Sequence, residues 1–166
     1  SIIISVTALG DAERLVTRSG AQVGDVVAFA GQLGLAAAGY AALSRGFRSP
    51  KVAVDAQRAP QPPFAAGPAA AAAGATAMTD VSDGLLADLG NIASASGVSV
   101  DLRSKDFVIH EAVQTLGQAL GGVDPLTFVL AGGEDYALVA TFPKGATLPD
   151  GWTSIGTVGD VSVVTV

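Results

Sequence analysis

The chain of 166 residues contains no cysteine, one histidine and only nine basic residues. The absence of cysteine excludes disulfides, zinc–thiolate sites and thiol catalysis. No stretch reaches the roughly 18 uninterrupted apolar residues of a membrane span, because glycine and proline interrupt the alanine-rich run at residues 65–75. The first residues, SIIISV, have neither the basic lead nor the cleavage site of a signal peptide. These absences predict a soluble cytoplasmic protein.

Positive charge is scarce as well: the net charge is −6 and the isoelectric point is near 4.4. Proteins that bind nucleic acid usually carry a basic patch, and none is visible here, so we expect neither nucleic acid nor a membrane as partner. If the ligand has phosphate groups, a divalent metal ion would be needed to neutralise the negative charges of both the acidic site and the ligand. Hydrophobic residues make up 49% of the chain, which is enough for one folded domain.

Apolar periodicity and turn residues predict a mixture of strands and helices. Residues 1–8 are predicted as a strand that continues from a preceding part of the protein. Residues 50–74 are predicted as a surface connection that contains one short helix. Further strands are predicted at residues 26–30, 98–102, 136–142, 152–158 and 161–166, and helices before Gly46 and at residues 85–97, 111–120 and 125–130. Because the two types do not alternate strictly, the fold class is predicted as α+β, a sheet with helices packed on it.

The string TAMTDVSDGLLADLG places Asp80 at the end of a predicted strand and Asp83 at the start of a predicted helix. Either Ser82 or Asp83 alone suits a helix N-cap. Two carboxylates that converge on one site, however, repel each other unless a cation lies between them. Magnesium bound by carboxylates and substrate phosphates is the candidate. The alternative is a capped helix without further function.

A second string, LAGGEDYAL, follows two glycines with Glu134 and Asp135. Glycines allow the backbone to approach a ligand closely, while the alternative is a helix end followed by two solvated acids. Part of the string also resembles the GG-acid-acid signature of diguanylate cyclases. That signature lies in a β-hairpin, whereas here the helical pattern PLTFVLA precedes the glycines.

Four other features of the sequence suit more than one role or a purely structural one. Arg18, beside Ser19 and Gly20, suits either a phosphate contact or a surface ion pair. The GQLG at residues 31–34 opens a helix and suits an anion-binding nest, but it lacks the lysine of a phosphate-binding loop. His110 is predicted as a surface or capping residue. Tyr136 and Trp152 are predicted to pack in the core or sheet.

Six strings occur in the order found in thiamine-monophosphate kinases, a family of the aminoimidazole ribonucleotide synthetase superfamily. They are VTALG, TRSGAQVGD, GQLGLAAAG, TAMTDVSDGLLADLGNIASASGV, LAGGEDYALVATFP and SIGTVGDV. TDVSDGLLADL is the most specific, and the resemblance covers nearly the whole chain. It implies a three-layer α/β/α domain with a mixed sheet, like the C-terminal domain of aminoimidazole ribonucleotide synthetase and in part like a ferredoxin fold. Residues 1–166 would be the C-terminal domain of a two-domain kinase, with residues 1–9 the last strand of the missing N-terminal domain.

The resemblance also implies an activity, the ATP-dependent phosphorylation of thiamine monophosphate to thiamine diphosphate by a homodimer. Asp80 and Asp83 resemble magnesium ligands, and Ser82 and Arg18 resemble ATP contacts. Glu134 and Asp135 lie where the family contacts the substrate. The family's aromatic tail has no counterpart before Val166. Two alternatives stay open, another ATP-using member of the superfamily and a non-catalytic interaction domain that kept the fold.

Overall fold

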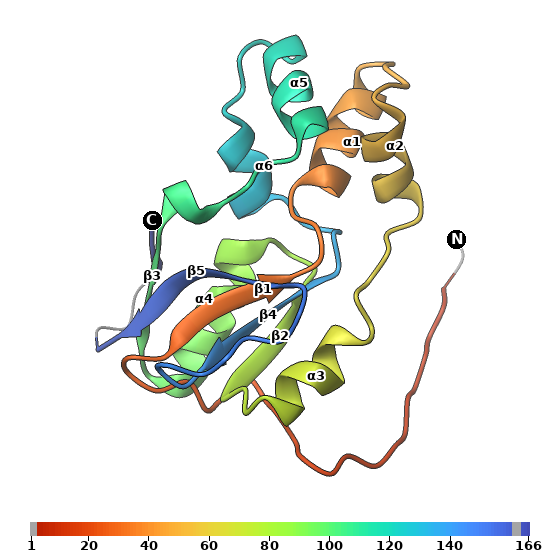
Figure 1. The fold of residues 1–166 in the computed structure, drawn as a ribbon. Coiled ribbons are helices and arrows are strands. Elements are labelled where there is room, and N and C mark those ends of the chain that lie inside the picture. The colour runs from red at the N-terminus through yellow and green to blue at the C-terminus, as the bar shows by residue number, and fades with distance from the viewer. Residues whose placement is uncertain (1–2, 161–163) are drawn as a thin grey trace.

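The computed structural model describes residues 3–160 and 164–166 (Figure 1). The helices are α1 (Leu35–Ser44), α2 (Lys51–Arg58), α3 (Ala66–Ala72), α4 (Leu85–Ser96), α5 (Glu111–Ala119) and α6 (Pro125–Ala131), with a 3-10 turn η1 (Ser104–Asp106). The strands are β1 (Val26–Ala30), β2 (Ala77–Val81), β3 (Ser99–Leu102), β4 (Ala137–Phe142), β5 (Trp152–Gly159) and β6 (Val164–Thr165).

The strands form one sheet in the order β2-β4-β1-β5-β3-β6. The sheet is mixed, because β3 and β6 are parallel while the other neighbouring strands are antiparallel. Both β1 and β2 run antiparallel to β4, so their carboxyl ends lie at the edge where β4 begins. The segments after β1, after β2 and before β4 therefore meet at this edge, which carries the candidate site.

Helices cover both faces of the sheet, as the alternation of side chains along each strand requires. On one face, Val27 and Val139 pack with Leu85, Leu89 and Ile92 of α4. On the other face, small and aromatic strand residues pack with α3 and with the segment around residue 16. The predicted α+β fold with a mixed sheet is confirmed, and the layers are α4, sheet and α3.

The helices α1, α2, α5 and α6 gather beyond the edge of the sheet where β1 ends (Figure 1). Their shared core is rich in alanine, which permits close helix packing. At Gly39 of α1, an added Cβ would lie 2.0 Å from the carbonyl oxygen of Ala53 in α2. A side chain at this position would force the two helices apart.

Two sequence predictions differ from the structure outside the sheet. Residues 3–8, the described part of the predicted strand at 1–8, form no strand; they run away from the body of the molecule, and Ile3 and Leu9 are 92% and 96% exposed (Figure 1). A strand needs a hydrogen-bonding neighbour, and the described residues offer none there. Residues 50–74 contain two helices, α2 and α3, instead of one. Residues 161–163 of the predicted last strand lie outside the described residues.

No helix within residues 3–160 and 164–166 is long and apolar enough to cross a membrane.

Candidate functional site

The DVSD segment leaves the sheet at the end of β2 and enters α4. Strand alternation places Asp80 on the face covered by α3, opposite Leu138 of β4. Asp80 and Asp83 are exposed, while Ser82 is half-buried. The two carboxylates are therefore accessible to a ligand at the edge of the sheet.

The GGED loop lies directly against this segment. The backbone N–H of Glu134 donates to the carbonyl oxygen of Ser82 at 2.8 Å, and that of Tyr136 donates to Val81 at 3.0 Å. A Cβ on Gly133 would lie 2.4 Å from the same Ser82 oxygen, so only glycine permits this approach. Glu134 and Tyr136 both have positive φ values, 68° and 52°. The structure thus places the segment that carries Asp80, Ser82 and Asp83 directly against the loop that carries Glu134.

Asp88, which the sequence analysis did not single out, holds the DVSD backbone in place. This carboxylate is 4% exposed, and its Oδ2 accepts from the backbone N–H groups of Ser82, Asp83 and Gly84 at 3.0, 3.0 and 3.2 Å. The N-cap of α4 is Gly84, with φ 120° and no side-chain cap. The predicted capping by Ser82 or Asp83 is therefore wrong, because a carboxylate inside the first turn already satisfies these donors. In the sequence, the signal for this role was an acidic residue in the first turn of the helix, where a carboxylate can accept from free backbone N–H groups.

Asp135 performs a similar task for α1. Its side chain is 7% exposed, and its two oxygens accept from the backbone N–H groups of Gly34 at 2.6 Å and Ala36 at 2.9 Å. Burial raises the pKa of the Asp135 carboxyl, and the hydrogen bonds from Ala36, Gly34 and Leu35 oppose that shift. The predicted substrate contact through Asp135 is not what the geometry favours, because both oxygens hold the start of α1. The same contacts fill the anion-binding nest predicted at residues 31–34.

Acidic side chains surround the phenol of Tyr136. Its hydroxyl donates to Oε2 of Glu134 at 3.2 Å. The negative charge of Glu134, this hydrogen bond, burial and the charges of Asp80 and Asp83 raise the pKa of Tyr136. The predicted core packing of Tyr136 is wrong, since positive φ turns the residue out of the strand. The prediction for Trp152 is confirmed: it is buried and packs edge-on against Phe142, with ring centroids 5.3 Å apart.

The oxygen donors at this edge suit magnesium. Magnesium in phosphate-transferring sites is held by one or two carboxylates together with water and substrate phosphates. Asp80 and Asp83 provide two accessible carboxylates, and residues 3–160 and 164–166 contain no group of three or more Asp, Glu or His side chains placed to hold a metal ion by themselves. A magnesium ion held by these two carboxylates would need further ligands from outside the described residues, such as substrate phosphates.

Arg18 lies apart from the other predicted site residues. Its carbonyl oxygen accepts from the hydroxyl of Ser96, the last residue of α4. Asp83 precedes the opposite end of this helix, and twelve residues of α-helix span about 18 Å. The structure therefore does not bring Arg18 to Ser82 and Asp83. His110 caps α5 as predicted, since its Nδ1 accepts from the N–H of Ala112 at 3.1 Å.

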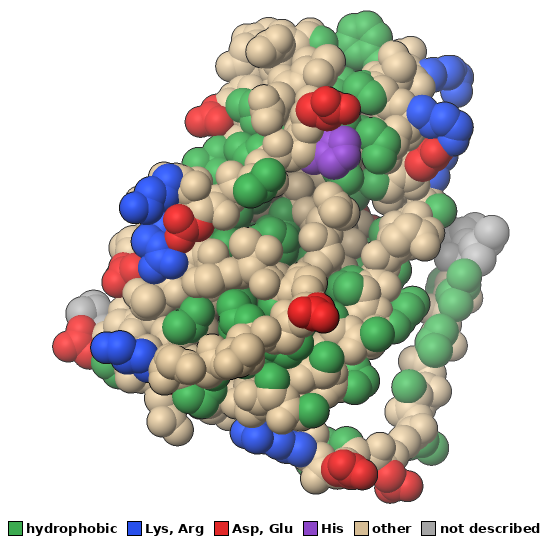
Figure 2. All heavy atoms as spheres, viewed as in Figure 1, with side chains coloured by type: hydrophobic (Ala, Val, Ile, Leu, Met, Phe, Trp, Pro, Cys, Tyr) green, Lys and Arg blue, Asp and Glu red, His purple; other side chains and the backbone are tan. Residues whose placement is uncertain are grey.

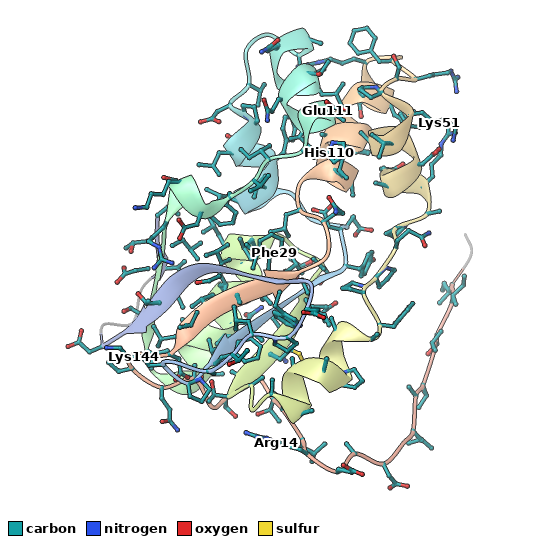
Figure 3. All side chains as sticks on the ribbon, in the orientation of Figure 1. Arg14, Phe29, Lys51, His110, Glu111 and Lys144 are labelled. Atoms are coloured by element: carbon teal, nitrogen blue, oxygen red, sulfur yellow. The ribbon has the colours of Figure 1, made fainter. Side chains whose placement is uncertain are left out.

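Basic side chains do not gather at the site. On the face shown in Figure 2, Lys and Arg side chains lie in separate groups, with Asp or Glu beside most of them. Figure 3 shows Arg14, Lys51 and Lys144 on separate parts of the molecule. The predicted absence of a nucleic-acid partner remains a prediction.

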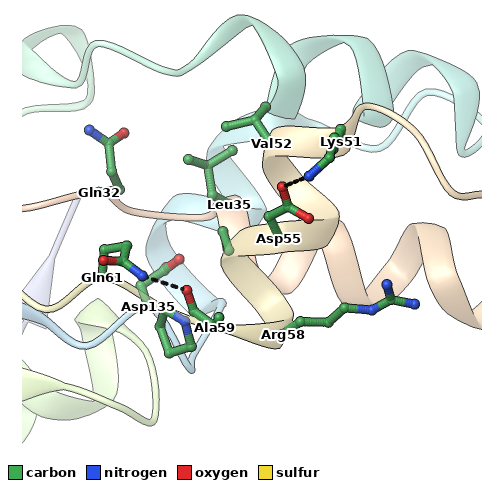
Figure 4. Close-up of a pocket in the computed structure, with 11 residues that line it drawn as sticks. Gln32, Leu35, Lys51, Val52, Asp55, Arg58, Ala59, Gln61 and Asp135 are labelled. Atoms are coloured by element: carbon green, nitrogen blue, oxygen red, sulfur yellow. Dashed lines mark hydrogen bonds and ion pairs between the residues drawn. The ribbon is translucent and has the colours of Figure 1, made fainter.

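Two hollows flank the site. The larger one, of about 710 Å³, lies between α1 and α2 and reaches Asp135 (Figure 4). Lys51 and Asp55 form an ion pair on its wall, and the side chain of Arg58 extends away from Asp135 (Figure 4). The smaller one, of about 330 Å³, lies directly beside Asp80 and Tyr136. Because the smaller pocket adjoins these acidic groups, we assign it to the candidate site.

Comparisons with known proteins identify the family of the chain. The family model described as AIR synthase related protein, C-terminal domain, matches residues 22–162. A thiamine-monophosphate kinase of Mycobacterium tuberculosis is 48% identical over 160 residues, which are 95% of this chain and 47% of the relative. The chain spans about half the length of the curated relatives it matches.

Solved structures show the same relationship. The crystal structure of thiamine monophosphate kinase from Aquifex aeolicus has a TM-score of 0.85 and 30% identity, and the match covers 94% of this chain and 54% of that one. The structure of AaThiL complexed with AMPPCP and TMP has a TM-score of 0.84 and 31% identity, covering 92% and 51%. The chain therefore belongs to the AIR synthase related family, whose C-terminal domain it contains, and it is similar there to the thiamine-monophosphate kinases.

Proposed function

We propose that the chain is the C-terminal half of a thiamine-monophosphate kinase, which uses ATP and magnesium to phosphorylate thiamine monophosphate to thiamine diphosphate. The observation that carries the proposal is the pairing of the DVSD and GGED segments, joined by the hydrogen bond from Glu134 to Ser82. It gathers the acidic groups at one accessible edge, in a chain 48% identical to such a kinase.

Each residue at this edge has a distinct proposed role. Asp80 and Asp83 hold magnesium, which when bound offsets negative charge on the phosphate oxygens. The hydroxyl of Ser82 contacts ATP, and Glu134 contacts thiamine monophosphate. Gly133 and Asp88 fix the backbone that carries these groups.

We propose different roles for the two remaining predicted contacts, Arg18 and Asp135. Arg18 stays a proposed contact of the nucleotide phosphates. Because it lies beside the C-terminal end of α4, it would contact the nucleotide from a different side than Ser82 does. Asp135 acts on the site by fixing α1.

Phosphoryl transfer requires alignment and charge neutralisation more than covalent participation of the protein. We therefore propose a direct in-line transfer from ATP to the acceptor phosphate, without a phosphorylated enzyme. Asp80, Asp83 and the Ser82 hydroxyl position the reactants, and the Tyr136 hydroxyl donates a hydrogen bond that orients Glu134. The whole enzyme is proposed to be a cytoplasmic homodimer of the thiamine biosynthetic route, with an N-terminal half that completes the site.

The turnover of thiamine monophosphate with ATP and magnesium tests this proposal. We expect activity in the full-length polypeptide and none in residues 1–166 alone, because one side of a shared site cannot align two substrates. Comparable turnover by both polypeptides would contradict the shared site. A full-length protein that phosphorylates a different acceptor would favour another member of the superfamily. A full-length protein that binds no nucleotide would favour the interaction domain.

A further inference from the structure

The C-terminal end of α4 is tied to the loop at residues 17–21, which carries Arg18. The hydroxyl of Ser96, the last residue of α4, accepts from the backbone N–H groups of Gly20 at 3.1 Å and Ala21 at 3.2 Å. The same hydroxyl donates to the carbonyl oxygen of Arg18 at 3.1 Å. A serine hydroxyl has one donor site and two acceptor sites. All three are used here, so the helix fixes the backbone of the loop.

Strand β2 holds the same loop as well. The backbone N–H of Met78 in β2 donates to the carbonyl oxygen of Thr17 at 3.0 Å. A Cβ on Gly20 would lie 2.2 Å from the carbonyl oxygen of Thr76, so the loop packs directly onto the chain just before β2. The loop backbone is therefore fixed by contacts with two separate elements.

The side chain of Arg18, by contrast, is exposed and unpartnered. Its guanidinium forms no hydrogen bond or ion pair with residues 3–160 and 164–166, whereas Arg45 and Arg103 are each engaged in contacts within the chain. A guanidinium suits phosphate because its planar fork can donate two parallel hydrogen bonds. A fixed backbone that presents such a group to solvent is suited to bind a phosphate ligand.

Helix α4 joins this loop to the DVSD segment. Asp88 in its first turn holds the DVSD backbone, and Ser96 at its last residue holds the Arg18 loop. Between them, Leu89 and Ile92 are fully buried in the core against the sheet, which fixes the helix in place. The twelve residues of α4 therefore set the separation, about 18 Å along the helix axis, between the proposed magnesium carboxylates and the loop.

We propose that Ser96 is a positioning residue for nucleotide binding, which holds Arg18 so that its guanidinium meets the phosphates of ATP at a fixed separation from the magnesium carboxylates. The inference rests on the proposed function and on the proposed phosphate contact of Arg18. It adds a residue that acts through Arg18 without touching the nucleotide. Without the Ser96 hydroxyl the charge of Arg18 stays, but the loop has to be ordered when the nucleotide binds, and that ordering weakens the affinity.

The test uses the full-length polypeptide and calorimetric titrations with a non-hydrolysable ATP analogue in magnesium, and separately with thiamine monophosphate. Ser96→Ala removes the hydroxyl and keeps a good helix former. The matched control is Ser94→Ala, which removes an exposed hydroxyl two residues earlier in the same helix. Ser96→Thr keeps the hydroxyl. Ser96→Cys keeps the shape of the side chain with much weaker hydrogen bonding, so it serves as a second variant that is expected to fold.

We expect Ser96→Ala to weaken binding of the ATP analogue about fivefold and Arg18→Ala about thirtyfold, since a charge-assisted contact with phosphate contributes more than the ordering of one loop. Ser96→Cys should lose affinity as Ser96→Ala does, while Ser96→Thr and Ser94→Ala should bind as the wild type does. No variant should change the affinity for thiamine monophosphate. In the Arg18→Ala background, Ser96→Ala should cause no further loss, because Ser96 acts only through Arg18.

An equal loss from Ser96→Ala with and without Arg18 would overturn the inference while leaving the proposed function intact. The same conclusion would follow if Ser96→Ala and Ser96→Cys bound the ATP analogue as Ser94→Ala does, or if they lost affinity for thiamine monophosphate in parallel. Wild-type affinity of Arg18→Ala for the ATP analogue would exclude the phosphate contact, and the inference with it. A wild-type protein that binds no ATP analogue would overturn the proposed function itself.

Discussion

Asp88→Ala removes the single carboxylate oxygen that accepts from three backbone N–H groups of the DVSD segment. These donors belong to Ser82, Asp83 and Gly84, at 3.0 to 3.2 Å. The carboxylate itself is 4% exposed, so its loss leaves a small cavity rather than an exposed gap. We expect the segment to open locally much more often, because no other described group accepts from these donors.

The magnitude follows from the type of hydrogen bond. A bond to a charged acceptor contributes about 1.5–3 kcal/mol net, and three donors that share one oxygen do not add fully. We therefore expect local opening to become easier by about 3 kcal/mol, which is roughly a hundredfold in the opening equilibrium. Asp88→Asn keeps a carbonyl acceptor without the charge, so it should cost about half as much.

Amide hydrogen exchange of residues 82–84, measured without metal, reads this effect directly. The control is Asp83→Asn, which changes an exposed carboxylate and leaves the Asp88 contacts in place. The control should exchange within about threefold of the wild type, as expected for a surface substitution. If Asp88→Ala also stays within about threefold, the role given to Asp88 is refuted.

Three further predictions concern the GGED loop. In the full-length enzyme, Glu134→Ala should raise the KM for thiamine monophosphate more than that for ATP; a rise confined to ATP would assign the loop to the other ligand. Gly133→Ala places a Cβ 2.4 Å from the Ser82 oxygen and should destabilise the fold by about 1–3 kcal/mol in a melting experiment. Gly90→Ala, in open space within α4, should not destabilise it, and equal effects of both would contradict the close approach. Burial raises the pKa of Asp135 above its ordinary 3.8, so the folded state binds that proton more tightly and the unfolding free energy falls as pH rises through the raised pKa. Asp135→Asn should lack this slope in denaturation curves between acidic and neutral pH, and an unchanged slope would exclude Asp135 as its source.

Local patterns predicted most elements of the fold. The helix at residues 85–97 and the strand at 26–30 were confirmed within one or two residues, because apolar periodicity and a closing glycine specify them locally. The order of strands was not predictable in this way. It places β4 between β1 and β2, and that pairing depends on residues more than 50 positions apart.

The roles of the acids were harder to predict than their presence. Asp83 looks like an N-cap in sequence, yet Asp88 satisfies the donors from inside the helix. Asp135 acts on Gly34, about 100 residues away along the chain. A short motif points to the acid that is nearest in sequence to the helix start. In the fold, the free N–H groups are capped by the acid whose carboxylate is buried against them. The roles of Asp80 as a metal ligand and of Glu134 as a substrate contact were implied by the family resemblance alone.

The most direct test of the central claim is the turnover of thiamine monophosphate by the full-length enzyme as a function of magnesium concentration. Asp80→Asn and Asp83→Asn keep the shape of the side chain and remove the charge. We expect a large fall in turnover for both variants, partly recovered at high magnesium, with melting temperatures near that of the wild type in the absence of metal. Full activity of both variants at low magnesium would contradict the account and leave DVSD as a helix start without a metal.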